Sequence, residues 1–170
     1  MLNIIQKDLI KAFKENEINV LIQQCNCFHT QNAGLAKSIK QEYPEILNVD
    51  LATPYGDKNK LGTFSYIAPE RKNISQTGYI INLYGQYRYG KGLQTDYDAQ
   101  RTGFKNIVEF LNNRGPVDTI KIFFDADLVP NSKQILAVLN QFGFKIWYFN
   151  YNPTKKILVL IVSQSKAILN

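Results

Sequence analysis

The amino-acid sequence predicts an α/β fold, with a mixed, mostly parallel sheet that helices cover on both faces. Apolar runs of strand length alternate along the chain with segments whose apolar residues recur at helical spacing. The run Val20, Leu21, Ile22 is wholly apolar, which is typical of a strand buried on both sides. A short turn at residues 150–154 joins the last two predicted strands, so this pair should be antiparallel.

The helices follow from the spacing of apolar residues and from helix stop signals. In residues 8–15, Leu9, Ile10 and Phe13 share one face, and the helix at 34–43 must end before Pro44 because proline cannot continue it. The other helices are expected at 45–51, 97–112 and 132–142. Strands are expected at 2–5, 20–24, 62–68, 78–84, 119–124, 145–149 and 156–162.

Length and composition predict one soluble domain over residues 1–170. The chain has 170 residues, of which 45% are hydrophobic and 20% charged, ordinary values for a globular protein with its own core. No apolar run is long enough to span a membrane, and the first residues read as a strand rather than as a signal peptide. We therefore expect a cytoplasmic protein without a membrane partner.

The positive charge is concentrated in the second part of the chain. The net charge is +6, and residues 99–170 carry nine basic and four acidic side chains. Because the lysines are scattered rather than clustered with aromatic residues, a solvated surface is the favoured interpretation. Nucleic-acid binding stays open as the weaker alternative, and steep salt dependence would be its signature.

Two cysteines and one histidine occur close together at the end of a predicted strand. Cys25 and Cys27 are too near each other for an ordinary disulfide clip, and a zinc site made of both with His29 would be cramped. Two reduced thiols are the favoured interpretation. No metal and no cofactor are expected.

Residues 20–43 combine a strand, a loop of small and polar residues, and the start of a helix. Free backbone N–H groups and the helix dipole at such a helix start favour a phosphate, and small residues let the ligand approach closely. Asn26, at the strand end, can both donate and accept hydrogen bonds, which suits a ribose hydroxyl. The alternative role for Asn26 is to tie down its own loop.

This stretch resembles the first ligand loop of the macrodomain family, whose members bind ADP-ribose and in some cases hydrolyse its conjugates. The resemblance rests on Asn26 and on Gly34 eight residues later, within Cys-Asn-Cys-Phe-x5-Ala-Gly-x-Ala-Lys. Asn-Leu-Tyr-Gly-Gln-Tyr at 82–87 and Tyr-Asp-Ala at 97–99 resemble compact macrodomains of bacteriophages and bacteria. The resemblance implies a three-layer α/β/α sandwich and, for a phage-encoded protein, the host cytoplasm as its location.

The resemblance also implies ligand-binding roles for particular residues. Asp8, with Leu9 after it, would take the adenine amino group, although Asp8 could also cap a helix. Asn26 would hold the distal ribose. The diphosphate would lie against a loop in which two of the family's usual glycines are replaced, formed by Asn32, Ala33, Gly34 and Leu35. Nucleotide contacts are also expected from the Tyr-rich segment, where the alternative is simple packing, at Tyr84, Gln86 and Tyr87.

Three residues are candidates for catalysis. Lys60 stands two residues before Gly62, where the branch that removes ADP-ribose from glutamate has a proposed nucleophile, and the alternative is a surface lysine in a turn. Asp125 and Asp127 lie where most macrodomains have a glycine-rich second phosphate loop, but here residues 124–132 contain no glycine. They are candidates for acid–base chemistry, and the alternatives are a turn that caps the next helix or a pocket that has lost ordinary ADP-ribose affinity.

The resemblance therefore implies an enzyme that hydrolyses an ADP-ribose linkage, either on a protein or in ADP-ribose 1″-phosphate. Its partners would be ADP-ribose or a related nucleotide and an ADP-ribosylated protein. The alternative is a non-catalytic module that binds or sequesters such a nucleotide, which the altered second loop favours.

Overall fold

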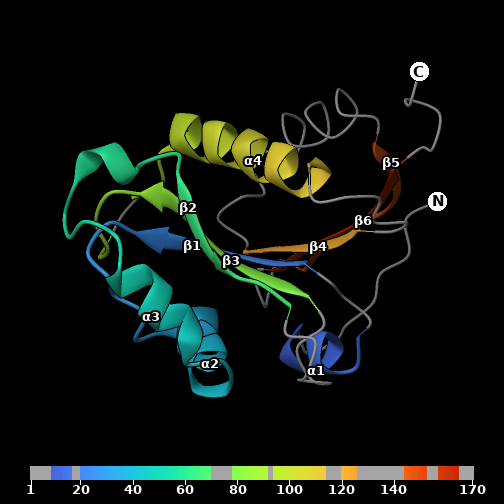
Figure 1. Cartoon of the computed structure of the whole chain (residues 1–170), viewed down its shortest axis with the longest axis horizontal. Coiled ribbons are helices and arrows are strands. Elements are labelled where there is room, and N and C mark those ends of the chain that lie inside the picture. Colours follow the sequence, from blue (N-terminus) through green and yellow to red (C-terminus); the bar gives the residue numbers. More distant parts are fainter. Residues whose placement is uncertain are drawn as a thin grey trace.

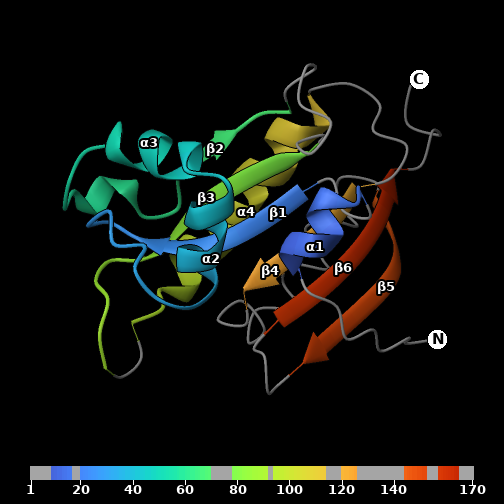
Figure 2. The ribbon, with the colours of Figure 1, turned by 90° about the horizontal axis from the view of Figure 1, so that it is seen from below.

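The computed structural model describes residues 9–16, 20–69, 78–91, 94–113, 120–125, 144–152 and 157–164. These residues form one six-stranded sheet of order β2-β3-β1-β4-β6-β5, as Figures 1 and 2 show. The strands are β1 (Val20–Asn26), β2 (Phe64–Ile67), β3 (Tyr79–Gln86), β4 (Ile120–Asp125), β5 (Phe144–Asn152) and β6 (Ile157–Gln164).

The sheet is mixed, as predicted. β1 runs parallel to its neighbours β3 and β4, whereas the pairs β2–β3, β4–β6 and β5–β6 are antiparallel. The antiparallel arrangement of the last two strands is confirmed. Among the described strands, parallel pairing occurs on either side of β1, and β6 returns beside β4 in the opposite direction.

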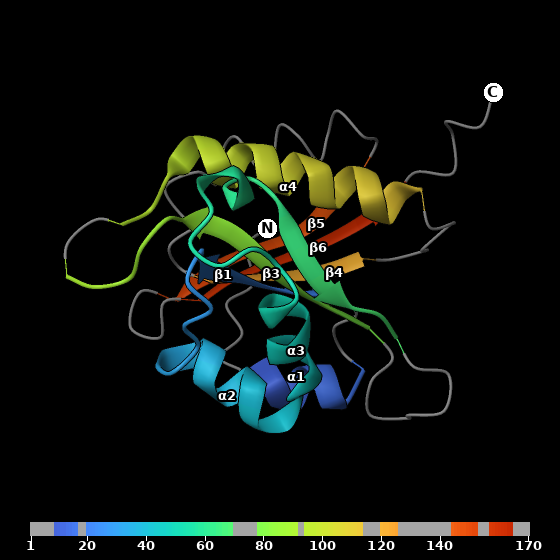
Figure 3. The ribbon, with the colours of Figure 1, turned by 60° about the vertical axis from the view of Figure 1, so that its left-hand side comes forward.

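Helices cover both faces of the sheet (Figures 1 and 3). α1 (Leu9–Lys14), α2 (Gly34–Glu42) and α3 (Glu45–Leu51) lie on one face, and α4 (Tyr97–Asn112) lies on the other. A short 3-10 helix, η1 (Lys58–Lys60), precedes β2. The predicted helix and strand positions agree with these elements, and the predicted strand at 2–5 and helix at 132–142 lie outside the described residues.

The core forms because alternate residues of β1 and β3 point to opposite faces. On the face of α1, α2 and α3, a buried apolar cluster contains Phe13, Leu21, Ile39, Ile46 and Ile80. The wholly apolar start of β1 is buried throughout, as a strand covered on both sides requires. Toward the carboxyl ends of β1 and β3, the residues on this same face become polar.

Candidate functional site

A row of polar side chains crosses three strands on the face covered by α3. The backbone pairing sets Ser65 of β2 opposite Asn82 of β3, and Asn82 opposite Gln23 of β1. Gln23 Nε2 donates to Asn82 Oδ1 at 2.7 Å, and Asn82 Nδ2 donates to Ser65 Oγ at 3.0 Å and to the carbonyl of Ile46 in α3 at 3.1 Å. The row therefore fixes α3 against the sheet.

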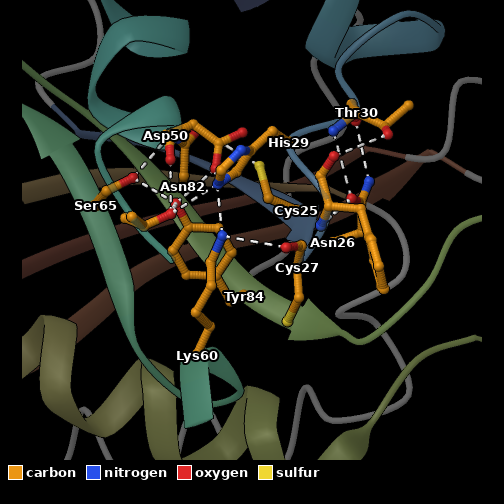
Figure 4. Close-up of polar contacts among 12 residues, drawn as sticks. Cys25, Asn26, Cys27, His29, Thr30, Asp50, Lys60, Ser65, Asn82 and Tyr84 are labelled. Carbon is orange, nitrogen blue, oxygen red and sulfur yellow. Dashed lines mark hydrogen bonds and ion pairs between the residues drawn. The ribbon is translucent and has the colours of Figure 1, made fainter. Parts of the chain in front are cut away.

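One step nearer the strand ends, Tyr84 and Asp50 form the centre of a buried cluster (Figure 4). Tyr84 OH donates to Asp50 Oδ1 at 2.8 Å and lies 2.9 Å from Ser65 Oγ. Gln31 Nε2 donates to the other carboxylate oxygen of Asp50 at 2.8 Å. Both Tyr84 and Asp50 are fully buried, and burial raises the pKa of the Tyr84 hydroxyl well above its usual range. Tyr84 therefore remains a neutral hydrogen-bond donor to the carboxylate.

Lys60 of η1 points into this cluster, as Figure 4 shows. Its Nζ lies 3.8 Å from Asp50 Oδ1 and 4.3 Å from the centre of the Tyr84 ring, and it donates to the carbonyl oxygen of Cys27 at 3.4 Å. Only 4% of the residue is exposed. Burial lowers the pKa of Lys60, while the negative charge of Asp50 opposes this change. The arrangement is a buried ion pair rather than the surface lysine that was the alternative.

The first ligand loop begins beside this ion pair and is held by Asn26. Asn26 Oδ1 accepts hydrogen bonds from the backbone N–H groups of Phe28 at 2.8 Å and Thr30 at 3.4 Å, and its Nδ2 donates to the Thr30 carbonyl at 3.0 Å. The loop-fixing role that was the alternative for Asn26 is thus present in the structure. Its contact with a ribose stays a prediction.

The loop ends at an open helix start. Asn32, Ala33 and Gly34 are exposed, and Gly34 has φ +54°, a left-handed conformation that glycine adopts without strain. Ala33 occupies the N-cap position of α2 with extended backbone, and no side chain caps the helix there. No acidic residue lies in the first turn, so backbone N–H groups and the helix dipole face the surrounding space. This is the local geometry that an anion needs.

The remaining predicted ligand residues are partly occupied with contacts inside the protein. Tyr84 was expected at the end of its strand as a nucleotide contact, but β3 continues to Gln86 and Tyr84 lies in the buried cluster. Gln86 Oε1 accepts from Gln24 Nε2 at 2.7 Å, and Tyr87 OH donates to the carbonyl of Gly56 at 2.9 Å. Leu35 is half-buried at the start of α2, against the apolar cluster.

Four of the predicted site residues cannot be placed as side chains. Asp8 and Asp127 lie outside the described residues, and only the backbone is described for Leu9 at the start of α1 and for Asp125 at the end of β4. Within the described part of the chain, no three His, Cys, Asp or Glu residues are grouped closely enough to hold a metal ion. No helix in that part is long and apolar enough to cross a membrane.

Asp50 is the site residue that sequence reasoning missed. It lies in α3 four residues after Ile46, and both side chains are buried on the same side of the helix. A carboxylate at a core-facing position of a helix is rare unless it is paired. This position in the apolar stripe was the signal that could have identified it.

Comparison with known sequences places the chain in a family. An uncharacterised 17.5 kDa protein from the tk-vs intergenic region of Enterobacteria phage T4 is 32% identical over 111 residues, which are 65% of this chain and 68% of that protein. The chain belongs to the family of this phage protein. No family model matches the sequence.

Similarity to solved structures identifies the fold. The chain is similar to the macrodomain of Mycobacterium tuberculosis DarG, with TM-score 0.54, 16% identity, and coverage of 83% of this chain and 91% of that one. It is also similar to a macrodomain protein from Streptomyces coelicolor (TM-score 0.50, 12% identity, 73% and 79% coverage) and to the macrodomain of Thermus aquaticus DarG (0.50, 14%, 67% and 70%). The chain has the macrodomain fold, a three-layer α/β/α sandwich, as predicted.

Proposed function

We propose that this macrodomain binds ADP-ribose at the carboxyl ends of β1 and β3 and hydrolyses an ADP-ribose linkage with Lys60 as the nucleophile. One observation carries the proposal. The buried Lys60 Nζ donates to the carbonyl of Cys27, the residue that follows Asn26, which supports a common site for the proposed nucleophile and the predicted ribose contact.

The ligand would lie along the exposed loop. The diphosphate would face the uncapped start of α2 at Ala33 and Gly34, where no acidic side chain of the first turn repels it. The distal ribose would then lie at Asn26, after a modest change in the hydrogen bonds that now hold the loop. This order brings C1″ of that ribose toward Lys60, whose neutral amine would attack it and displace the linked carboxylate or phosphate. Water would then hydrolyse the lysine adduct, releasing ADP-ribose and the free amine.

A lysine acts as a nucleophile only when its amine is neutral, and burial favours that state. The pKa of Lys60 is lowered from its ordinary value of 10.5, with burial as the main cause. Asp125 and Asp127 remain candidates for acid–base assistance, as their positions after Phe124 imply. The expected substrate is an ADP-ribosylated protein or ADP-ribose 1″-phosphate.

A binding module without turnover is the second candidate function. The ion pair with Asp50 favours it, because a nearby carboxylate stabilises the charged, non-nucleophilic form of Lys60. The glycine-free sequence after β4 favours it as well. Such a protein would sequester ADP-ribose or a related signalling nucleotide.

The first experiment is calorimetric titration of the purified protein with ADP-ribose, with AMP as the control ligand. We expect micromolar binding of ADP-ribose and weaker binding of AMP, which lacks the diphosphate and the distal ribose. Absence of detectable ADP-ribose binding would refute the hydrolase function and would leave only a binding module for a different nucleotide.

The second experiment separates the two candidates by release of ADP-ribose from ADP-ribosylated protein and of phosphate from ADP-ribose 1″-phosphate. We expect Lys60→Ala to abolish turnover, and Lys105→Ala to preserve it because Lys105 is exposed on α4 and makes none of the contacts described for Lys60. Binding by the wild-type protein without any turnover would leave the binding module as the function.

A further inference from the structure

Asp50 is a fully buried carboxylate to which the proposed function gives no role. Burying a charge is costly, and proteins retain such a group only where hydrogen bonds and an opposite charge compensate the lost hydration. Here Tyr84 and Gln31 supply the hydrogen bonds and Lys60 supplies the charge. Because these groups compensate the burial of Asp50, we infer that the residue has a defined role in placing the Lys60 amine.

We propose that Asp50 is the positioning residue for Lys60, which holds the amine at the strand ends beside Cys27 and sets how readily it loses its proton. The inference deepens the proposed function and rests on it only for the claim that the amine reacts.

The carboxylate can hold Lys60 because it cannot turn away. Tyr84 OH on Oδ1 and Gln31 Nε2 on Oδ2 fix the carboxylate from two sides, each at 2.8 Å. Tyr84 itself is oriented by Ser65, 2.9 Å from its hydroxyl. The backbone that carries Lys60 is fixed as well, because Asp57 caps the start of η1 and its side chain accepts from the N–H of Asn59 at 2.8 Å.

The same carboxylate connects Lys60 to the predicted diphosphate loop. Gln31, which donates to Asp50, is buried and is followed directly by the exposed residues Asn32, Ala33 and Gly34. A ligand bound to that loop would therefore affect Asp50, which holds the amine, through one hydrogen-bonded side chain, that of Gln31.

The charge state of Lys60 follows from the groups that face it. Asp50 faces it from α3, Tyr84 from β3, Cys25 and Cys27 from β1 and its loop, and Asp57 from its own 3-10 helix. Burial lowers the pKa of Lys60, and Asp50 is the largest influence in the opposite direction. Replacing Asp50 with a neutral isostere should therefore lower the pKa of Lys60 further.

The experiment is a pH titration of the Lys60 Cε signal by NMR on protein labelled with ¹³C-lysine, with Lys60→Met to assign the signal. In Asp50→Asn the midpoint should fall by about one pH unit or more, the effect expected for loss of an opposite charge within 4–6 Å. Ser65→Ala is the matched control, because it disturbs the same cluster without changing its charge. An unmoved midpoint in Asp50→Asn, or an equal fall in Ser65→Ala, would overturn the proposal.

Tyr84→Phe keeps the proposal testable if Asp50→Asn does not fold. It removes one hydrogen bond from the carboxylate but keeps the ring beside Lys60 and the ion pair itself. Without this donor the negative charge of Asp50 is less compensated by hydrogen bonds and attracts the ammonium group more strongly. The titration midpoint of Lys60 should therefore rise. A fall or no change would contradict the assigned role.

Turnover separates this proposal from the proposed function. If the wild-type protein hydrolyses ADP-ribose conjugates, the rising limb of its pH–rate profile should move to lower pH in Asp50→Asn, whereas a purely structural role would reduce the rate equally at every pH. If the wild-type protein has no turnover, the hydrolase function fails, and the NMR midpoints still decide whether Asp50 governs Lys60.

Discussion

The substitution Ala33→Asp should stabilise the fold and weaken ligand binding at the same time. Ala33 is exposed and already has the extended backbone of an N-cap residue, but its methyl group caps nothing. A carboxylate there can accept from the free N–H groups of the first turn and complement the helix dipole, so no packing is lost and a cap is gained.

The two magnitudes follow from the geometry. A side-chain cap in place of alanine contributes about 0.5–2 kcal/mol, and for a chain of this size about 1 kcal/mol corresponds to a rise in Tm of roughly 2–4 °C. The same carboxylate occupies the backbone N–H groups that would bind the diphosphate, and its negative charge repels the diphosphate. At a separation of about 4 Å the repulsion is about 1–4 kcal/mol per pair of charges. We expect ADP-ribose affinity to fall at least tenfold.

Urea unfolding and calorimetric titration on the same preparation test both effects. Ser38→Asp is the matched control, because it adds the same charge on the exposed side of α2 one turn beyond the loop, where it caps nothing. Unchanged ADP-ribose affinity in a stabilised Ala33→Asp protein would show that the diphosphate does not bind at the start of α2. A destabilised protein would show that the N-cap assignment is wrong.

Two further predictions concern stability. Asp50→Ala should reduce the free energy of unfolding by about 3–5 kcal/mol, because it leaves a buried ammonium group without its carboxylate. Lys60→Met should cost less, since Asp50 keeps the hydrogen bonds from Tyr84 and Gln31; equal losses in urea unfolding would argue against this account of the cluster. Gly103→Ala should cost about 1–3 kcal/mol despite the better helix propensity of alanine. Its Cβ would lie 2.2 Å from Leu83 Cδ1 and 3.2 Å from the carbonyl of Gly62, and a higher Tm in calorimetry would contradict this packing argument.

The helices and strands could be predicted because their signals are local. The apolar spacing of residues 45–51 and 97–112 gave the bounds of α3 and α4, and the apolar run at Val20 identified β1. The order of the strands and the direction of β6 beside β4 depend on long-range pairing, which no local pattern encodes. For this reason the sequence pattern alone could not specify the strand order.

The candidate site was predictable only in part, for a related reason. Lys60 was found because it stands at a fixed distance from Gly62, but its burial could not be read from a sequence that suits a surface turn equally well. The strand was predicted to end at Tyr84, with a loop from Gly85 onward. The chain instead continues through Gly85 in β3, where a Cβ would lie 2.8 Å from the side chains of Gln24 and Gln100. The glycine permits close packing rather than a turn.

The contacts described for Lys60 and Asp50 join four separate stretches of the chain, namely the first loop at Cys27 and Gln31, α3, η1, and β3 at Tyr84. These stretches are brought together only by folding. A change at Asp50 alone in a descendant of this chain would leave a buried ammonium group without its opposite charge. We therefore expect relatives of this protein to keep Asp50 and Lys60 together or to replace both.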